Sequence, residues 1–201
     1  MILPPLSIRR LYTEAQIELQ LLSIVSYGRC IFYGVNQNKT TTLMIRGLSC
    51  TDKDHIYDII NSAAGAYRGV IPSDCYHEPY MPGEELQREM STMTFFGWEE
   101  RNELVGVMGF QPVKDVTLIR HAYVLPDHQG KGIGTRLLER LKQMTRTRQL
   151  LVGTWADATW AIEFYEKRGF KRMPDKDELL KRYWNIQQRQ IETSVVLGLE
   201  L

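Results

Sequence analysis

The sequence predicts an α+β fold in which a central mixed, mostly antiparallel sheet carries helices on both faces. Residues 92–98 and 104–110 are aromatic and β-branched segments joined by a polar turn, which is typical of an antiparallel hairpin. Strand-like and helical segments then follow one another between residues 116 and 197, which indicates a mixed sheet rather than a fully parallel one. Because the chain has 201 residues, it is long enough for one domain and short for two.

The first half of this fold is expected to begin with a short strand at residues 43–46. Thr51–Asp54 follows, with the spacing of a helix capping box. Apolar residues at three- and four-residue spacing then predict the buried face of a helix: Ile56, Ile59, Ile60, Ala63 and Ala64. Residues 65–83 are rich in glycine, proline and aromatic residues and predict a loop, and residues 84–89 predict a brief second helix.

The second half combines a long amphipathic helix with further strands. Residues 116–124 predict a third strand. The helix after it is marked by apolar residues on one face: Ile133, Leu137, Leu138, Leu141 and Met144. The remaining elements are expected as a strand at residues 150–155, a helix at 159–168 that stops at Gly169, a strand at 170–173, a short helix at 177–184 and a β-branched strand at 191–197.

The amino-acid composition of the chain argues against several classes of binding partner. Lysine plus arginine (25) nearly balance aspartate plus glutamate (24), so no global field draws the protein to nucleic acid or to an anionic membrane. The three cysteines lack a C-x-x-C pair, which indicates neither a disulfide framework nor a metal site. Polar residues interrupt the apolar stretch around residues 21–25, which excludes a spanning helix and argues against a signal peptide. We expect a soluble protein of the reducing cytoplasm.

A glycine-rich turn leads from the strand at residues 116–124 directly into the amphipathic helix. Its sequence is Gln129-Gly130-Lys131-Gly132-Ile133-Gly134-Thr135. Unpaired backbone N–H groups and the positive end of the helix dipole face one spot there, which suits a pyrophosphate. The glycines remove side chains that would keep an anion from the backbone, and Lys131 adds positive charge at the rim. A glycine-rich connection without a ligand is the alternative.

Other phosphate-binding turns do not fit. A dinucleotide G-x-G-x-x-G motif requires glycine where Thr135 or Leu137 stands, and the G-K-[ST] of a P-loop is absent. The pattern that remains is Q-x-x-G-x-G, and downstream Ala161–Phe170 matches A-x-x-F-Y-x-x-x-G-F. Together these two motifs resemble the GNAT superfamily of N-acetyltransferases. A weaker resemblance extends over residues 44–197.

The resemblance implies the GNAT fold and an N-acetyltransferase that moves an acetyl group from acetyl-CoA, its co-substrate, to a primary amine by direct attack in a ternary complex. It implies that the fourth and fifth strands splay apart and free backbone groups at Val124 and Leu125, the Val124 N–H steadying the thioester oxygen. The cofactor-binding residues so implied are Val124, Leu125, Gln129, Gly130, Lys131, Gly132, Ile133, Gly134 and Thr135. The alternatives are a non-catalytic acyl-CoA-binding or sensor module of the same fold, and an interaction domain.

The same resemblance implies one catalytic residue, and a departure from it at Leu118 directs attention to a second. Tyr165 matches the family tyrosine that protonates the departing thiolate, although a tyrosine on this helix face also suits a core position. Many relatives carry a glutamate that acts as the general base at the position where this chain has Leu118. His121 on the same strand is a substitute, but strict alternation places it on the opposite face unless a bulge intervenes. A structural role for His121 is the alternative, and His77, Glu78 or water are other candidate bases.

The resemblance implies that the acceptor amine enters between the first two helices and the hairpin, which places it beside the loop at residues 65–83. Tyr67, Glu78 and Tyr80 are the candidate substrate-binding residues, because a carboxylate can hold an ammonium group and tyrosine rings can pack on it. The acceptor is a small molecule or a peptide. A second departure from the family is Ala158, where relatives often place an asparagine that contacts the cofactor. Dimers are common among relatives, so a homodimer is one expectation.

Residues 1–43 form a separate segment upstream of the predicted 44–201 acetyltransferase domain. They lack clear periodicity and end in a polar run. Because many relatives begin directly with their first strand, and Met44 stands just before Ile45, the segment is expected to be a disordered or non-native extension. The alternative is a genuine accessory arm with an extra helix at residues 14–26.

Overall fold

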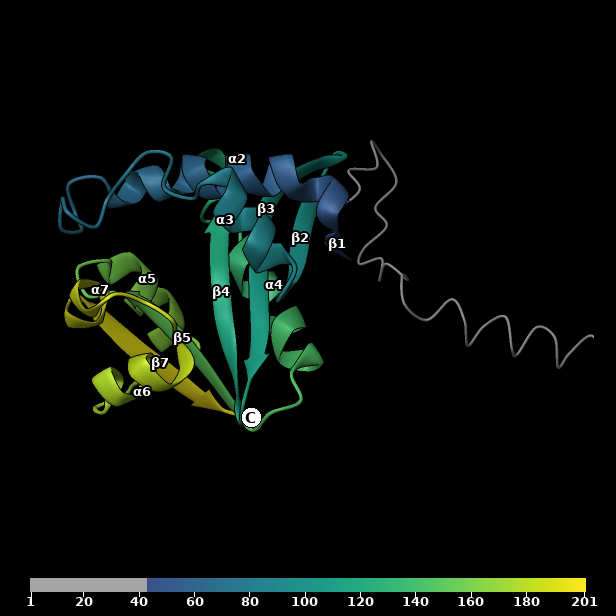
Figure 1. The fold of residues 1–201 in the computed structure, drawn as a ribbon. Coiled ribbons are helices and arrows are strands. Elements are labelled where there is room, and N and C mark those ends of the chain that lie inside the picture. Colours follow the sequence, from purple (N-terminus) through teal and green to yellow (C-terminus); the bar gives the residue numbers. More distant parts are fainter. Residues whose placement is uncertain (1–42) are drawn as a thin grey trace, which may run out of the picture. The chain divides into compact units, whose positions relative to one another are not determined.

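The computed structural model describes residues 43–201 of the chain (Figure 1). Within these residues seven strands form one sheet in the order β1-β2-β3-β4-β5-β7-β6. Neighbouring strands are antiparallel except β4 and β5, which are parallel, so the predicted mixed, mostly antiparallel sheet is confirmed. The strands are β1 (Leu43–Gly47), β2 (Thr94–Glu100), β3 (Glu103–Val113), β4 (Val116–Val124), β5 (Gln149–Trp155), β6 (Lys171–Arg172) and β7 (Ser194–Glu200).

Helices cover both faces of this sheet, as the sequence predicted. Neighbouring residues of β4 show the two faces: Ile119 packs in a core with α4 and α5, whereas Leu118 packs in a core with α6 and α7. Val107, on the same face as Leu118, packs under α2 and α3. The helices are α2 (Lys53–Ala64), α3 (Gly83–Met90), α4 (Ile133–Met144), α5 (Thr159–Glu166), α6 (Lys176–Tyr183) and α7 (Gln188–Glu192), with short 3-10 turns at Cys50–Asp52, Gly65–Tyr67 and Pro126–His128.

The periodic apolar residues explain why the two longest helices form and where they pack. In α2 the five predicted core positions are all buried, and in α4 Leu137, Leu138 and Leu141 have no exposed surface. Met144, at the end of the same stripe, is 37% exposed because α4 ends there. Full burial of a leucine side chain stabilises a fold by about 2 kcal/mol, so the α4 stripe is a major anchor of the sheet.

Two predicted boundaries were wrong. The capping box lies at Ser49–Asp52 instead of Thr51–Asp54: the Asp52 carboxylate accepts a hydrogen bond of 2.9 Å from the Ser49 backbone N–H, and a 3-10 turn precedes α2. The final strand, predicted from Ile191, begins at Ser194, since Ile191 belongs to α7 and buries its side chain in the core beneath α6 and α7. Tertiary burial here overrides the β propensity of isoleucine.

The sheet opens at its centre. β4 and β5 pair only through Thr117–Ile119 and Leu150–Val152, and beyond this point the two strands diverge, as Figure 1 shows. Each strand keeps its other partner, β3 or β7, along the diverging stretch. Strands in a continuous sheet lie about 4.8 Å apart and leave no room between them. The divergence therefore creates a gap that backbone groups of Arg120–Val124 and Gly153–Trp155 border.

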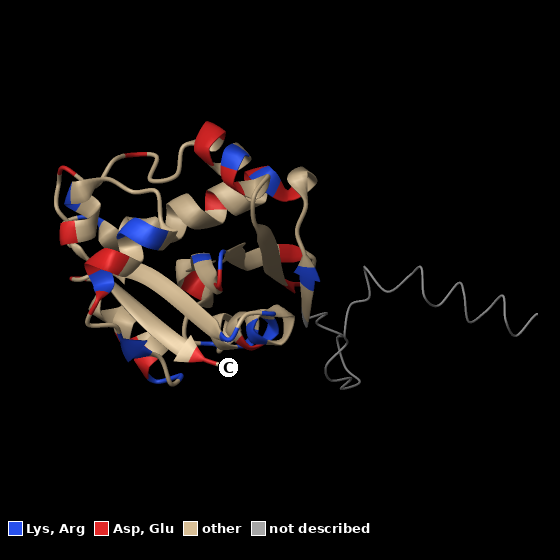
Figure 2. Cartoon of the chain, turned by 60° about the horizontal axis from the view of Figure 1, so that its bottom comes forward, with Lys and Arg blue, Asp and Glu red and all other residues tan. Residues whose placement is uncertain are grey.

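Charged residues are interspersed over the described helices and loops, with blue and red segments side by side in Figure 2. This distribution agrees with the near balance of charges in the sequence. No helix among residues 43–201 is long and apolar enough to cross a membrane. The predictions for the N-terminal extension, including its helix at residues 14–26, lie outside the described residues.

Candidate active site

A cleft of about 860 Å³ occupies the gap between β4 and β5. Its floor is formed by Arg120–Tyr123 of β4 and Val152–Trp155 of β5. Tyr165 of α5 lies on one side, and residues of α3 and of the loop before it lie on the other. The connection between α6 and α7, residues 184–187, completes the wall. The cleft thus joins both halves of the described chain at the point where the sheet opens.

A β-bulge in β4 reorients His121. Val107 pairs with Tyr123 and Gly109 with Arg120, so β4 has one more residue than β3 between these pairs. His121 takes up this extra length with a φ of +48°, a conformation that few non-glycine residues adopt. Its ring stacks on Phe95, with 5.8 Å between ring centroids, on the sheet face that α2 and α3 cover. The bulge that the alternation of the strand required is therefore present.

Glu89 of α3 contacts His121 of this bulge and the paired residue before it, Arg120. Its carboxylate accepts a hydrogen bond of 2.7 Å from the Arg120 guanidinium, and its other oxygen pairs with Nε2 of His121. The side chains of Glu89 and His121 are 19% and 11% exposed. Burial acts to raise the pKa of Glu89, but the hydrogen bond and charge of His121 and the charge of Arg120 outweigh it and hold the pKa below its ordinary value. Glu89 is therefore a carboxylate anion in the wall of the cleft.

Tyr165 is both a core residue and a cleft residue. Its ring is 4% exposed and packs edge-on against Phe164 and Phe170, with centroids 5.0 and 5.2 Å away. The residue also lines the cleft, and its hydroxyl has no hydrogen-bond partner within residues 43–201. Burial, and then the nearby Tyr67, raises the pKa of Tyr165 despite the opposing charge of Arg168. The phenol consequently keeps its proton near neutral pH and can donate it.

The glycine turn has the geometry of an open backbone loop. Gly130 and Gly132 have φ angles of +74° and +79°, and no atom lies within 4 Å of the place where a Cβ would stand at either. Gly132 directly precedes α4, so the first N–H groups of that helix point out beside it. At Gly134 a Cβ would lie 3.2 Å from the Phe164 ring, so this glycine brings α4 close to α5. Ile133 is buried in the core, which leaves only its backbone at the turn.

Val124 and Leu125 differ in the groups that they leave open. The Leu125 N–H donates to Val105 and its carbonyl accepts from His128, so the expected free backbone group at Leu125 was wrong. The backbone groups of successive residues in a strand point to alternate sides. The N–H and the carbonyl of Val124 therefore face away from β3, toward the gap. The Val124 carbonyl accepts a hydrogen bond of 3.0 Å from the Gln129 side chain. Its N–H has no partner within residues 43–201.

Arg168 adds a positive charge at the start of α4 that the sequence analysis missed. Its guanidinium stacks 3.7 Å from the centroid of the Phe164 ring and donates to the Thr135 hydroxyl, 3.1 Å from Nε. Thr135 therefore already has a protein partner. Lys131 is exposed at the rim of the turn. None of the residues 124–135 lines the cleft, so the turn and the cleft are separate parts of the candidate site, and β4 leads from one to the other.

The predicted acceptor residues separate into two groups. Tyr67 and Tyr80 line the cleft with ring centroids 5.4 Å apart, and the Tyr80 hydroxyl accepts a hydrogen bond of 3.0 Å from Trp155. Burial, and then the nearby Tyr80, raises the pKa of Tyr67 to about 12. Glu78 lies outside the cleft, where Arg68 and the Tyr76 hydroxyl engage its exposed carboxylate.

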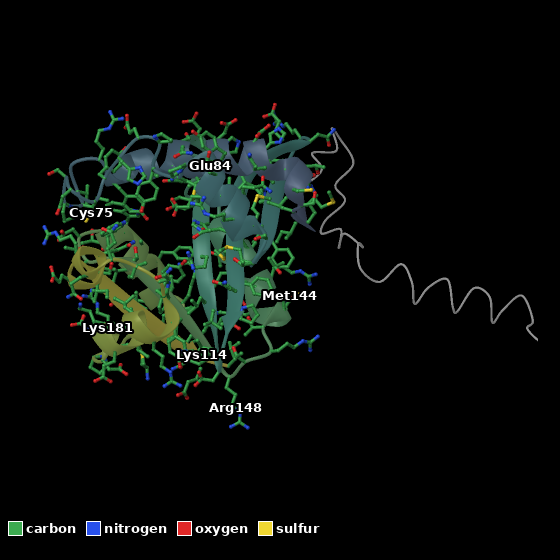
Figure 3. The ribbon with its side chains drawn as sticks, viewed as in Figure 1. Cys75, Glu84, Lys114, Met144, Arg148 and Lys181 are labelled. Carbon is green, nitrogen blue, oxygen red and sulfur yellow. The ribbon has the colours of Figure 1, made fainter. Side chains whose placement is uncertain are left out.

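Glu85 of α3 is the carboxylate that the cleft offers in place of Glu78. It is half-buried, lines the cleft beside Tyr80, and has no ion-pair partner within residues 43–201. The preceding residue, Glu84, is exposed on the same helix and lies outside the cleft (Figure 3). Glu85 and Glu89 stand one helical turn apart, and this spacing is the sequence signal that could have identified both.

The loop before α3 closes over the far end of the cleft. Asp74 accepts a hydrogen bond of 2.9 Å from Arg189 of α7, which ties the loop to the C-terminal half. Cys75 lies beside this contact and lines the cleft (Figure 3). Ala158, at the start of α5, is fully buried next to Ile71 and Trp155, so no polar side chain replaces the family asparagine at that position.

This arrangement, a sheet that opens beside a glycine turn and a buried tyrosine, is accompanied by a family match. The sequence model of the acetyltransferase (GNAT) family matches residues 56–170, which is more than half of the chain. The chain therefore belongs to the GNAT acetyltransferase family. Membership implies acyl transfer as the general class of activity.

Solved structures share the fold. The PaiA N-acetyltransferase from Thermoplasma acidophilum, in complex with coenzyme A, matches with a TM-score of 0.62 and 18% identity over 80% of this chain and 99% of that chain. An acetyltransferase of the GNAT family from Staphylococcus aureus gives 0.62 and 16% over 80% and 99%. A GNAT acetyltransferase from Elizabethkingia anophelis with acetyl-CoA bound gives 0.53 and 21% over 79% and 98%. At these identities the likeness establishes the fold.

Proposed function

We propose that the protein is an N-acetyltransferase that moves an acetyl group from acetyl-CoA to a primary amine by direct attack in a ternary complex. The observation that carries this proposal is the divergence of β4 and β5, which opens a cleft lined by Tyr165, while the Val124 N–H at the end of β4 has no partner within residues 43–201. The coenzyme A and acetyl-CoA bound in two structural neighbours are consistent with it.

The glycine turn supplies the binding site for the pyrophosphate of acetyl-CoA. The positive φ angles and the open space at Gly130 and Gly132 let an anion reach the backbone N–H groups at the start of α4. Lys131 and Arg168 add positive charge nearby. The backbone of Ile133 and the side chain of Gln129 complete this proposed set, in which Gln129 also fixes the Val124 carbonyl. The Val124 N–H then donates to the thioester oxygen.

The chemistry requires a neutral amine, a polarised carbonyl and a proton donor. The amine nitrogen bonds to the thioester carbon, and the carbon–sulfur bond breaks to give the thiolate of coenzyme A. Tyr165 donates the phenolic proton to that thiolate, and a base takes the proton that the amine loses. His121 is the proposed base, because it lines the cleft and Glu89 engages one of its nitrogens.

The acceptor enters between Tyr67, Tyr80 and Glu85. The two rings give an ammonium group aromatic faces, and the unpaired Glu85 carboxylate gives it an opposite charge. This proposal replaces Glu78 by Glu85 as the acidic contact. The cytoplasmic location and the homodimer remain predictions.

The test combines calorimetric titration of the purified chain with acetyl-CoA and a thiol-release assay across a panel of amines. Wild type is expected to bind acetyl-CoA and release thiol in an amine-dependent way. Tyr165→Phe should bind acetyl-CoA equally and lower kcat by about 100-fold, since a general acid contributes on that order. Equal kcat in wild type and Tyr165→Phe would contradict the role of this tyrosine, and a failure to bind acetyl-CoA would contradict the function.

A non-catalytic acyl-CoA-binding or sensor module is the second candidate. The observation that favours it is Leu118, which is fully buried and cannot accept a proton where relatives have a glutamate. Saturable acetyl-CoA binding without thiol release on any amine would support this module and contradict the transferase.

A further inference from the structure

We propose that Glu89 is a positioning residue that holds His121 as the base for the acceptor amine, so that a carboxylate from α3 supports the chemistry that strand β4 lacks at Leu118. This inference rests on the proposed acetyl transfer. The role of His121 as the base belongs to that proposed function. The new element is that Glu89 gives the His121 ring one orientation and one tautomer.

The backbone at His121 shows that its orientation is imposed by its surroundings. A φ of +48° is unfavourable for a residue with a Cβ, so contacts of the side chain must stabilise it. Two such contacts are present: the stack on Phe95 and the pair with Glu89. Both come from the face of the sheet that α2 and α3 cover. The bulge and its partners therefore form one unit.

The Glu89 contact selects a tautomer. A carboxylate only accepts hydrogen bonds, so Nε2 of His121 carries the proton and donates it to Glu89. In the neutral ring the lone pair is then on Nδ1. Nδ1 makes no hydrogen bond within residues 43–201, and it is not among the buried polar atoms that lack a partner there. Nδ1 is thus accessible to solvent, and His121 lines the cleft, as a base for the acceptor requires.

Arg120 keeps Glu89 in place from the second side of the carboxylate. Its guanidinium donates to Oε1 at 2.7 Å while His121 engages Oε2, so each oxygen of Glu89 already has a protein partner. We therefore assign Glu89 a role through His121 rather than on the amine. Glu85 of α3 and Tyr123 of β4 also line this cleft, and Phe95 of β2, which stacks on His121, is uncharged.

The test is a double-mutant cycle of Glu89→Gln and His121→Gln in the full chain, measured by thiol release with the best amine. Each single variant is expected to lower kcat by about 100-fold, with unchanged acetyl-CoA affinity, and the double variant is expected to be no slower than His121→Gln. The KM of the amine should stay unchanged in Glu89→Gln, because Glu89 acts through His121 and does not hold the substrate.

A merely structural role for Glu89 gives a different result. The two losses would then multiply in the double variant, or Glu89→Gln would raise the KM of the amine and lower acetyl-CoA affinity and the unfolding temperature with an unchanged kcat. If His121→Gln had the same kcat as wild type, the inference would also be overturned. Turnover by the wild-type protein would in that case still support the proposed function. No turnover by wild type on any amine would overturn the proposed function and this inference with it. Glu84→Gln on the exposed face of α3 is the matched control and should match wild type.

Discussion

The glycine turn and the wall of the cleft around His121 are built in opposite ways. The turn offers backbone N–H groups at two positive-φ glycines and needs no particular side chain. The wall is made of side chains. In it, Glu89 contacts Arg120 and His121, which lie 31 and 32 residues further along the sequence. The turn should therefore depend on backbone conformation, whereas the wall should depend on pH and on the identity of single charged groups.

The largest effect is expected at the turn. Gly132→Val should lower acetyl-CoA affinity by about 100-fold, because a β-branched residue at a φ of +79° adds on the order of 2–3 kcal/mol of strain and moves the N–H groups. Calorimetric titration measures this change. Gly65→Ala is the control, since Gly65 has a φ of −53° and open space around it. Equal affinities of Gly132→Val and wild type would remove the turn from the binding site.

An intermediate effect is expected from the unpaired carboxylate of the wall. Glu85→Gln should raise the KM of the amine by about tenfold with unchanged kcat and acetyl-CoA affinity, because a charge-assisted hydrogen bond contributes about 1.5 kcal/mol more than a neutral one. Initial rates at varied amine concentration measure it. Glu84→Gln, one residue away and exposed, should leave the KM unchanged. If both variants shift the KM equally, Glu85 is no specific contact.

The smallest effect is on the pH dependence of stability. The pKa of Glu89 lies below its ordinary value of 4.5 in the fold, so its ionised form stabilises the native state above that pH. This contribution should disappear as the pH falls from 4.5 through the lowered pKa. The free energy of unfolding of wild type should thus fall more steeply over this acid range than that of Glu89→Gln. Parallel curves would show that the Glu89 contacts contribute nothing to stability.

The same contrast explains what the sequence could predict. The turn lies in consecutive residues from Gln129 to Thr135, and Tyr165 lies in a contiguous motif, so local patterns identify them. Glu89 and Glu85 gain their meaning only when α3 is packed beside β4, and Glu78 was favoured in their place because loop composition does not show which way a carboxylate points. The bulge at His121 could be named as a requirement, but its presence depends on the pairing of β3 with β4.

Boundaries failed for the same physical reason. Ser49 and Thr51 both suit a cap, and the contact of Asp52 with Arg46 on β1, at 2.7 Å, favours the earlier one. Backbone groups of Leu125 were expected to be free, yet its N–H donates to the Val105 carbonyl just beyond the last pair of the β3–β4 ladder. In each case a contact with a residue of a neighbouring strand, Arg46 of β1 or Val105 of β3, decided between two locally acceptable arrangements.

Mass analysis of a mixture of amines after incubation with the protein and acetyl-CoA tests the central claim most directly. The account predicts that one class of primary amine gains a single acetyl group, with an equal amount of coenzyme A released, and that Tyr165→Phe slows both together. Saturable binding of acetyl-CoA with no acetylated amine and no released coenzyme A would contradict it.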